Sequence, residues 1–458
     1  MTITARPDII DPEPWRFPQP TSRRLSNGME LVLYDLPGQH VISATLVLAQ
    51  DLATEPAEKE GVTTLLARLL FEGTVTHPGG RLAEALESCG ATMGQQVSLY
   101  GMRVTMDAPA THLAPALSLM AEAVREPDCA EPDVARHLRL RLAEIARLRK
   151  NSAALAHYEF QRRVLAETDR ASRPIGGSPS TIGALTADDV RERADAVLSP
   201  EGATIVIGGD IENHEALLAL VDSCFGSWVR PVEHVAPPPL HPGKPGVTVI
   251  DRPGAVQADV RIGGWSIDRT DPRWPELRIA GHIMGGTFTS RLNSVLREER
   301  GLTYGIQLGL DPQREGGTWA AGGSFRSADI GCAITLLHDL LRIDTAPFTP
   351  EEVGSAQRHL ISTAPLQFAT AGGVVDRSTL QILLGLPHDH LDQEQEALRS
   401  VNAEAATRAY SEIIDTDRLT CVIVGDAHAV VPQLIDAGFV PDVVTARGPG
   451  ETGQPPGR

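Results

Sequence analysis

The stretch that decides how this chain is interpreted is GVTTLLARLLFEGT, residues 61–74. Its apolar residues recur at the i, i+3, i+4, i+7 and i+8 spacing of a helix with one buried face, namely Val62, Leu65, Leu66, Leu69 and Leu70. We therefore predict an amphipathic helix over residues 61–71. On this helix Thr64, Ala67 and Arg68 fall outside the apolar stripe.

This frame resembles the active-site helix of the pitrilysin and mitochondrial processing peptidase family. There a run close to G-L-A-H-x-L-E-H-M-L-F-x-G-T carries the inverted zinc motif H-x-x-E-H. The glycines at both ends, the Leu-Leu-Phe run and the closing Gly-Thr are kept. Thr64 stands at the position of the first zinc histidine, Ala67 at that of the general-base glutamate and Arg68 at that of the second histidine.

The replacements remove the chemistry that the motif supplies. A catalytic zinc needs three protein ligands and an open position for water. Threonine is a poor ligand, a permanent guanidinium cation repels Zn²⁺, and alanine cannot take a proton from water. We therefore expect no metal ion in this chain, and no single substitution would restore the site.

The third zinc ligand of the family is a glutamate on a later helix, and Glu144 in the run RHLRLRLAEI, residues 136–145, matches its position. A helper glutamate seven residues earlier is replaced by His137. We hypothesise that Arg68 and Glu144 form an ion pair where zinc would sit. The alternatives are that Arg68 pairs with Glu72 at i+4 spacing, or that Glu144 is one charge on a solvated, arginine-rich helix.

The resemblance fails at a further strand of the first half. Active members of the family have an edge strand of the type Gly-Gly-x-x-Asn-Ala, to which a substrate peptide adds as an extra strand. Residues 90–96 read GATMGQQ, so that Gly94 and Gln95 take the Asn-Ala positions.

The chain contains an internal repeat. A capped helix begins at Thr186 and is followed by the apolar strand 203–210, which ends in Gly-Asp. The same pattern begins at Asn402 and ends with the strand 419–426, an offset of 216 in both elements. An interval of this length indicates duplicated domains, since solenoid repeats are about 20–50 residues long.

A Pro-rich linker, residues 231–246, joins the halves and contains six prolines and two glycines. Strands and helices occur in blocks, which favours an α+β fold. We predict two homologous α+β halves at 20–230 and 247–435 that open like a clam, as in the family. Residues 436–458 are expected to be a partly disordered tail.

The second half keeps a family signature. The run MGGTFTSRL, residues 284–292, leads into LREERGLTYG, residues 296–305. In dimeric members, an arginine and a tyrosine seven residues apart reach into the zinc site of the partner, and Arg297 and Tyr304 match both type and spacing. Without the resemblance, Arg297 is a residue of a solvated helix end and Tyr304 an ordinary strand residue.

The pair Gly285 and Gly286 lies in the same signature and is a candidate for contact with substrate. Two glycines would allow a peptide backbone to approach closely, although helix-to-helix packing alone would also explain them. His388 and His390 follow Pro387 in an expected loop without a third ligand nearby, and we interpret them as surface histidines.

Composition excludes several classes of partner. The formal net charge of −18 argues against nucleic acid and anionic membranes, because both would be repelled. The charge is compatible with basic peptides, but it equally serves solubility. The five dispersed cysteines indicate no disulfide framework, and the N-terminus has no apolar segment. We expect a cytoplasmic protein.

Together these features predict the non-zinc-binding subunit of a heterodimeric metalloendopeptidase that cleaves unfolded peptides. The resemblance implies a homologous zinc-bearing partner whose active site Arg297 and Tyr304 complete in trans, with zinc in the partner and no cofactor in this chain. Leader-peptide processing is one such role. The alternative is an inactive pseudopeptidase that acts as a scaffold or peptide-binding module.

Overall fold

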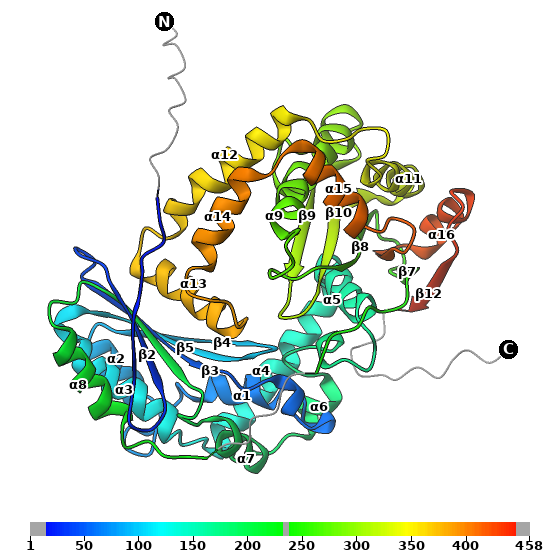
Figure 1. Ribbon diagram of the computed structural model, residues 1–458. Helices are drawn as coiled ribbons and strands as arrows, with labels where there is room; N and C mark the ends of the chain where they lie inside the picture. The colour runs from blue at the N-terminus through cyan, green and yellow to red at the C-terminus, as the bar shows by residue number, and fades with distance from the viewer. Residues whose placement is uncertain (1–14, 232–237, 446–458) are drawn as a thin grey trace, which may run out of the picture.

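The computed structural model describes residues 15–231 and 238–445. They form two six-stranded mixed sheets, each with helices on its faces (Figure 1). The predicted α+β fold is confirmed. No helix in the described ranges is long and apolar enough to cross a bilayer.

The first sheet has the strand order β1-β2-β6-β3-β5-β4. Its β2–β6 pair is parallel and the other neighbours are antiparallel. Because side chains alternate along a strand, one face packs on the helices of the first half and the other faces the second half. The strands are β1 (Thr21–Arg24), β2 (Glu30–Asp35), β3 (Val41–Leu48), β4 (Thr92–Ser98), β5 (Gly101–Pro109) and β6 (Thr204–Gly209).

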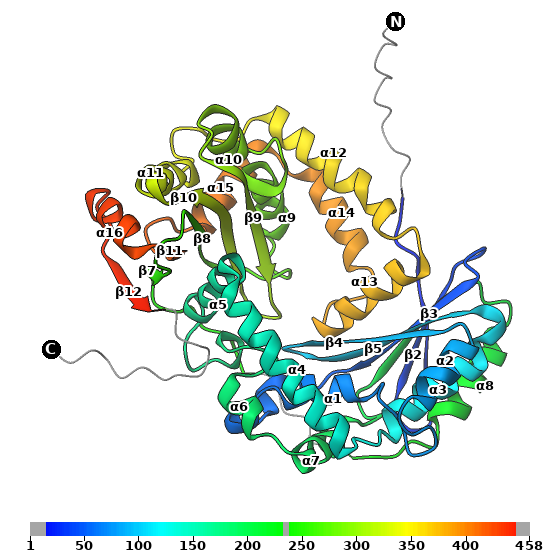
Figure 2. The ribbon, with the colours of Figure 1, turned by 180° about the vertical axis from the view of Figure 1, so that it is seen from behind.

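The helices of the first half gather on the outer face of this sheet, where α1, α4 and α7 lie together (Figure 2). Leucines of the predicted stripe on α1 pack there into the larger of the hydrophobic cores. These helices are α1 (Val62–Leu69), α2 (Arg81–Ser88), α3 (Leu113–Arg125), α4 (Glu131–Lys150), α6 (Pro179–Ala184), α7 (Ala187–Val197) and α8 (His214–Phe225).

The second sheet has the order β12-β7-β11-β8-β10-β9 and repeats the first apart from one outer strand. Its edge strand β9 corresponds to β4. The strands are β7 (Gly246–Asp251), β8 (Gln257–Ser266), β9 (Thr303–Pro312), β10 (Gly317–Arg326), β11 (Thr420–Gly425) and β12 (Pro441–Thr445). The helices are α9 (Trp274–Gly281), α10 (Arg291–Asn293), α11 (Ile330–Leu341), α12 (Pro350–Gln367), α14 (His390–Ser400), α15 (Ala403–Ile413) and α16 (Ala427–Asp436).

The repeat seen in the sequence is present in the structure with the same offset. Both bounds of α7 and β6 recur in α15 and β11 after 216 residues. The hydrogen bonds repeat as well. The Gly38 amide donates to Asp210 Oδ2 at 2.9 Å, and the Gly254 amide donates to Asp426 Oδ2 at 2.9 Å. The Gly-Asp endings therefore fix the same turn in both halves.

Each half contributes one helix to the sheet of the other. Helix α5 (Ser152–Val164) packs its Leu155 and Phe160 against Val422 and Val424 of β11. In return, α13 (Ala371–Leu383) places Val374 and Val375 on the inner face of the first sheet. This exchange is visible in both views (Figures 1 and 2). A division of the chain into two contiguous halves does not describe this exchange, because each half includes a helix that packs on the sheet of the other.

The ordered fold extends beyond the segment 20–435 at both ends. Phe17 is buried against Tyr34 and α13, and its amide donates to Asp392 Oδ1 of α14 at 2.9 Å. At the other end β12 pairs in parallel with β7, so Pro441–Thr445 of the expected tail belong to the second sheet. Residues 446–458 lie outside the described ranges.

Phe17 offers a test of this N-terminal attachment. Phe17→Ala removes a ring that is 1% exposed and should lower the free energy of unfolding by about 3–5 kcal/mol. The measurement is chemical denaturation followed by fluorescence. The matched control is Phe288→Ala, whose ring is 63% exposed and should cost below about 1 kcal/mol. Equal losses in both variants would contradict the attachment.

Candidate functional site

Helix α1 begins at a buried carboxylate. Gly61 precedes the helix with a φ of 99°, and Glu55 Oε1 accepts a hydrogen bond from the Thr63 amide at 2.9 Å. Glu55 Oε2 lies 3.3 Å from the Gly61 nitrogen, which donates to it. The first amides of a helix have no partner within the helix and carry its positive dipole end, so a carboxylate stabilises them.

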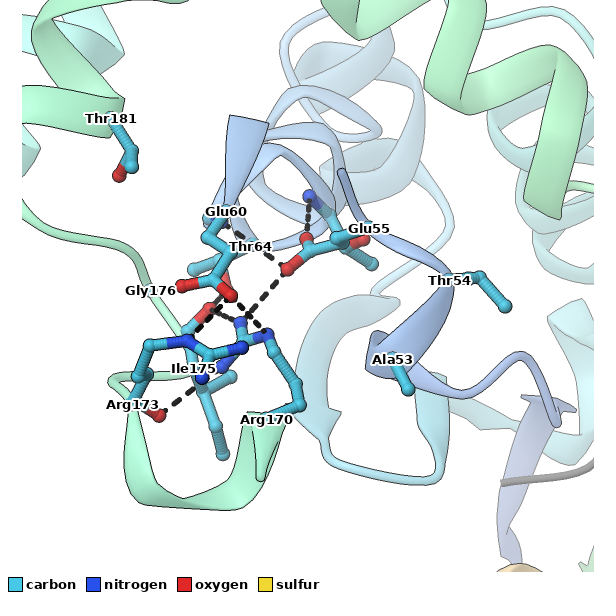
Figure 3. Close-up of polar contacts among 12 residues, drawn as sticks. Ala53, Thr54, Glu55, Glu60, Thr64, Arg170, Arg173, Ile175, Gly176 and Thr181 are labelled. Carbon is cyan, nitrogen blue, oxygen red and sulfur yellow. Dashed lines mark hydrogen bonds and ion pairs between the residues drawn. The ribbon is translucent and has the colours of Figure 1, made fainter. Parts of the chain in front are cut away.

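Two arginines from a later segment pair with Glu55 and with the neighbouring Glu60 (Figure 3). Arg170 Nη2 donates to Glu55 Oε2 at 2.8 Å, and Arg173 Nε donates to Glu60 Oε1 at 2.8 Å. The Glu55 side chain is fully buried and that of Arg170 is 6% exposed. Removing either partner would leave an uncompensated charge inside the protein, so the network holds α1 against the 170–176 loop.

Thr64 and Ala67 stand at the family's first zinc-histidine position and general-base position. Both make contacts that hold the fold. Thr64 Oγ1 donates to the carbonyl oxygen of Ile175 at 3.2 Å. Ala67 is fully buried and belongs to the hydrophobic core. The expectation that it lies outside the buried stripe is wrong, because neighbouring elements cover this face of α1 as well.

The predicted pair of Arg68 and Glu144 is confirmed. Arg68 Nη1 and Nη2 donate to the two carboxylate oxygens of Glu144, each at 2.9 Å. Arg141 Nη1 donates to Glu144 Oε2 at 3.1 Å. Burial would raise the pKa of Glu144, but the hydrogen bonds from Arg68 and Arg141 outweigh it and hold this pKa below its ordinary value.

The alternative pairing of Arg68 with Glu72 does not occur. Glu72 instead pairs with Arg136, and its Oε1 lies 2.6 Å from His137 Nε2. His137, at the helper-glutamate position, is itself buried. Both residues come from α4, so Glu72 joins α1 to that helix.

This donor set does not fit zinc. Of the four positions only Glu144 offers a usable ligand, and both of its oxygens are engaged by a guanidinium. Across the described residues, no group of three or more His, Cys, Asp and Glu side chains is placed to hold a metal ion. His388 and His390 are half-buried, which corrects their interpretation as surface histidines, and burial lowers the pKa of His390.

The Arg/Tyr pair lies in the other half of the chain. Arg297 belongs to the short helix η6 (Ser294–Glu299), and Tyr304 lies at the start of the edge strand β9. The Arg297 guanidinium carbon lies 3.4 Å from the ring centre of Phe288, and Nη1 lies 2.8 Å from Glu298 Oε1. Tyr304 is 91% exposed. The cation is thus oriented by its neighbours, while the phenol projects into solvent.

The two glycines of this signature have different surroundings. Gly285 is buried, and a Cβ there would lie 2.5 Å from the backbone nitrogen of Leu308 on β9. Close packing of the short helix η5 (His282–Gly286) against strand β9 explains this glycine, which favours the packing interpretation for Gly285, with a strand in place of the expected helix. Gly286 is exposed and remains a candidate.

The structure does not bring the two groups of candidate residues together. Within the described ranges, no hydrogen bond or ion pair joins Thr64, Arg68 or Glu144 to Arg297 or Tyr304. The sequence analysis also missed Glu55 and Arg170, because no local motif distinguishes them. Their 115-residue separation is closed only by the fold.

Comparison with known proteins agrees with this geometry. The family description "Insulinase (Peptidase family M16)" matches residues 32–171, and "Peptidase M16 inactive domain" matches residues 184–360. The chain belongs to the M16 peptidase family. The insulinase match covers the half with the altered zinc motif, and the inactive-domain match includes Arg297 and Tyr304.

Relatives in this family include an uncharacterized zinc protease of Mycobacterium bovis, 28% identical over 64% of this chain and 67% of that protein. The fold is similar to the M16 inactive domain protein of Pseudomonas fluorescens, with a TM-score of 0.83, 21% identity, and 89% and 98% of the two chains covered. A chain of complex III2 from Candida albicans has a TM-score of 0.75 at 12% identity, with 91% and 99% covered.

The left-handed conformation at the start of α1 can be tested. Gly61→Ala should destabilise the protein because its Cβ would lie 2.8–2.9 Å from Ile182, Gly176 and Gly177. Gly28, with a φ of 89° and open space around it, is the control for backbone strain alone. Chemical denaturation should show Gly28→Ala costing about 1–2 kcal/mol and Gly61→Ala roughly 1–3 kcal/mol more. Similar values would contradict tight packing at Gly61.

The Arg68–Glu144 pair predicts a pH dependence. Because the pKa of Glu144 lies below the ordinary value of 4.5 in the folded state, the pair stabilises the protein above that pH. This contribution is lost as the pH falls through the folded pKa. Glu144→Gln should therefore lower the thermal midpoint at pH 7, and the difference from wild type should shrink by pH 3. Glu404→Gln, on an exposed part of α15, is the control and should show no such change.

Proposed function

We propose that this chain is the non-zinc-binding subunit of a heterodimeric M16 metalloendopeptidase. The observation that carries the proposal is the contrast between its two halves. Where ligands are expected, Arg68 and Glu144 bind one another at 2.9 Å. In the second half, at the segment proposed to approach the partner, the Arg297 guanidinium is held over the Phe288 ring and the Tyr304 side chain is 91% exposed.

The chemistry of the Arg/Tyr pair supports a role in peptide hydrolysis. A tyrosine hydroxyl can donate a hydrogen bond to the oxyanion that forms at a scissile carbonyl, and such donors contribute several kcal/mol. A guanidinium can orient the peptide through two directed donors. Phe288 beneath Arg297 limits the positions of its side chain, which reduces the entropy lost on binding.

The partner is proposed to be a homologous subunit that carries H-x-x-E-H and holds the zinc. The substrate is an unfolded peptide, and the exposed Gly286 would let its backbone approach the second half. Cytoplasmic leader-peptide processing is the role that we favour for such a pair of subunits. In this proposal the present chain binds and orients the substrate peptide, and the partner subunit supplies the metal.

The second candidate is a pseudopeptidase that serves as a scaffold, and the likeness to a complex III2 chain supports the fold of such a protein. An exposed tyrosine beside an oriented arginine argues for the enzymatic subunit. A scaffold needs neither the phenol in solvent nor the stacked guanidinium.

The decisive experiment mixes the purified chain with a zinc-bearing M16 subunit encoded by the same genome and measures zinc content and peptide cleavage. The chain alone should contain no zinc and cleave nothing. The pair should cleave, and Tyr304→Phe should reduce kcat by at least about 10²-fold. Its thermal midpoint should not change, because the hydroxyl lies in solvent.

Arg297 provides the second arm of this experiment. Arg297→Lys keeps the charge but loses the planar fork, and cleavage should fall. Arg300→Lys, three residues further along and exposed, is the matched control and should retain activity. Full activity in both Tyr304→Phe and Arg297→Lys would reject the enzymatic role and favour the scaffold.

A further inference from the structure

A cavity of about 710 Å³ lies between the two halves. Its walls come from β4 and β5, from α4 and α5, from the 171–176 loop, from the end of β9 and from α13. Helices α5 and α13, which the halves exchange, both contribute residues to this lining. The volume is that of a site for a ligand the size of a short peptide segment.

The charged lining of this cavity is predominantly basic. Arg103, Arg141, Arg173 and Arg269 contribute guanidinium groups, and Asp311 is the one carboxylate among the described lining residues. Burial raises the pKa of Asp311. The chain as a whole has a net charge of −18, so the lining has the opposite sign to the molecule.

Carboxylates behind the walls cancel this charge only in part, because several of them are shared between arginines. Arg141 shares Glu144 with Arg68, so that two cations face one anion. At the other end of the cavity, Glu394 is 2% exposed and is shared by three arginines. Its distances are 2.9 Å to Arg278, 3.5 Å to Arg377 and 4.0 Å to Arg269. The other two lining arginines each have a carboxylate of their own, since Arg173 pairs with Glu60 at 2.8 Å and Arg103 lies 3.8 Å from Asp376.

Some of these cations also lack hydrogen-bond acceptors. The Nε atoms of Arg269, a lining residue, and of Arg377, which lies behind the wall, are buried and have no hydrogen-bond partner among the described residues. Burying donors of a charged group without acceptors is costly, so the positive charge at this wall is incompletely compensated. Guanidinium groups accept carboxylates in a bidentate geometry.

We propose that this cavity binds acidic peptide segments and selects substrates rich in Asp and Glu. The inference rests on the proposed function in that the ligand is taken to be a peptide. A confined space with low-dielectric walls concentrates the field of its lining, so the local excess of arginine dominates over the distant negative surface. The sign of the charge on the preferred peptide is then set by the arginines of the lining. It is the reverse of what the net charge of −18 alone would favour, namely basic peptides.

The test is direct binding to the isolated full chain, measured by fluorescence anisotropy. Three labelled peptides of equal length on a Gly/Ser background carry four Asp, four Lys or no charge. The acidic peptide should bind about tenfold more tightly than the neutral one at 0.05 M salt, and the ratio should fall at about 0.5 M salt. The basic peptide should bind most weakly.

Variants assign the preference to the cavity. Arg103→Gln and Arg141→Gln should each reduce the ratio of acidic to neutral affinity by about threefold, whereas Arg141→Lys should retain it. Arg408→Gln, at an exposed position of α15 outside the cavity, removes the same charge and should change nothing. Thermal midpoints of the variants verify that they fold. Arg103→Gln and Arg141→Gln are two independent tests of whether the cavity sets the preference.

The outcomes separate this inference from the proposed function. Equal affinity for the three peptides, or an unchanged ratio in both cavity variants, overturns the inference even if the chain with its partner cleaves peptides. Tighter binding of a single-stranded oligonucleotide with four phosphates than of the acidic peptide overturns it as well. Acidic preference without cleavage in any pairing supports the binding site and rejects the enzymatic role.

Discussion

The buried carboxylate of Glu55 is the interaction on which the first half depends. It accepts hydrogen bonds from the first amides of α1 and is paired with Arg170, whose side chain is 6% exposed. A charge at this depth is costly unless it is paired and hydrogen-bonded, so the start of the helix, the loop and the ion pair depend on one another. The orientation of α1 is therefore set from its N-terminus.

That constraint explains why the altered zinc motif still lies on a well-formed helix. Thr64 bonds the loop held by Arg170, and Arg68 binds Glu144 of α4. In a peptidase of this family, zinc would join α1 and α4. Here the bidentate pair of Arg68 and Glu144 and the contacts of Glu72 with α4 add charged contacts to the apolar packing between these two helices.

The exchange of α5 and α13 makes the two halves interdependent. Each helix covers apolar strand residues of the opposite sheet, as Phe160 does on β11 and Val375 on the first sheet. Opening the halves would expose these surfaces, and the hydrophobic cost of exposure favours the closed arrangement. The basic cavity between them is thus a product of the assembled fold, since its arginines come from both halves.

The sequence by itself determined the α+β class and the duplication, and its resemblance to the family indicated the loss of the zinc ligands and the pair of Arg68 with Glu144. The first two depend on periodicity and on an offset of 216 residues, and the last two depend on matching single positions to a known motif. Only the tertiary structure decided the burial of Ala67, the packing of Gly285, the capping of α1 by Glu55 and the exchange of α5 with α13. Those features join residues far apart in the chain, and no local pattern encodes which distant surface will cover a helix face or which arginine will meet a buried carboxylate.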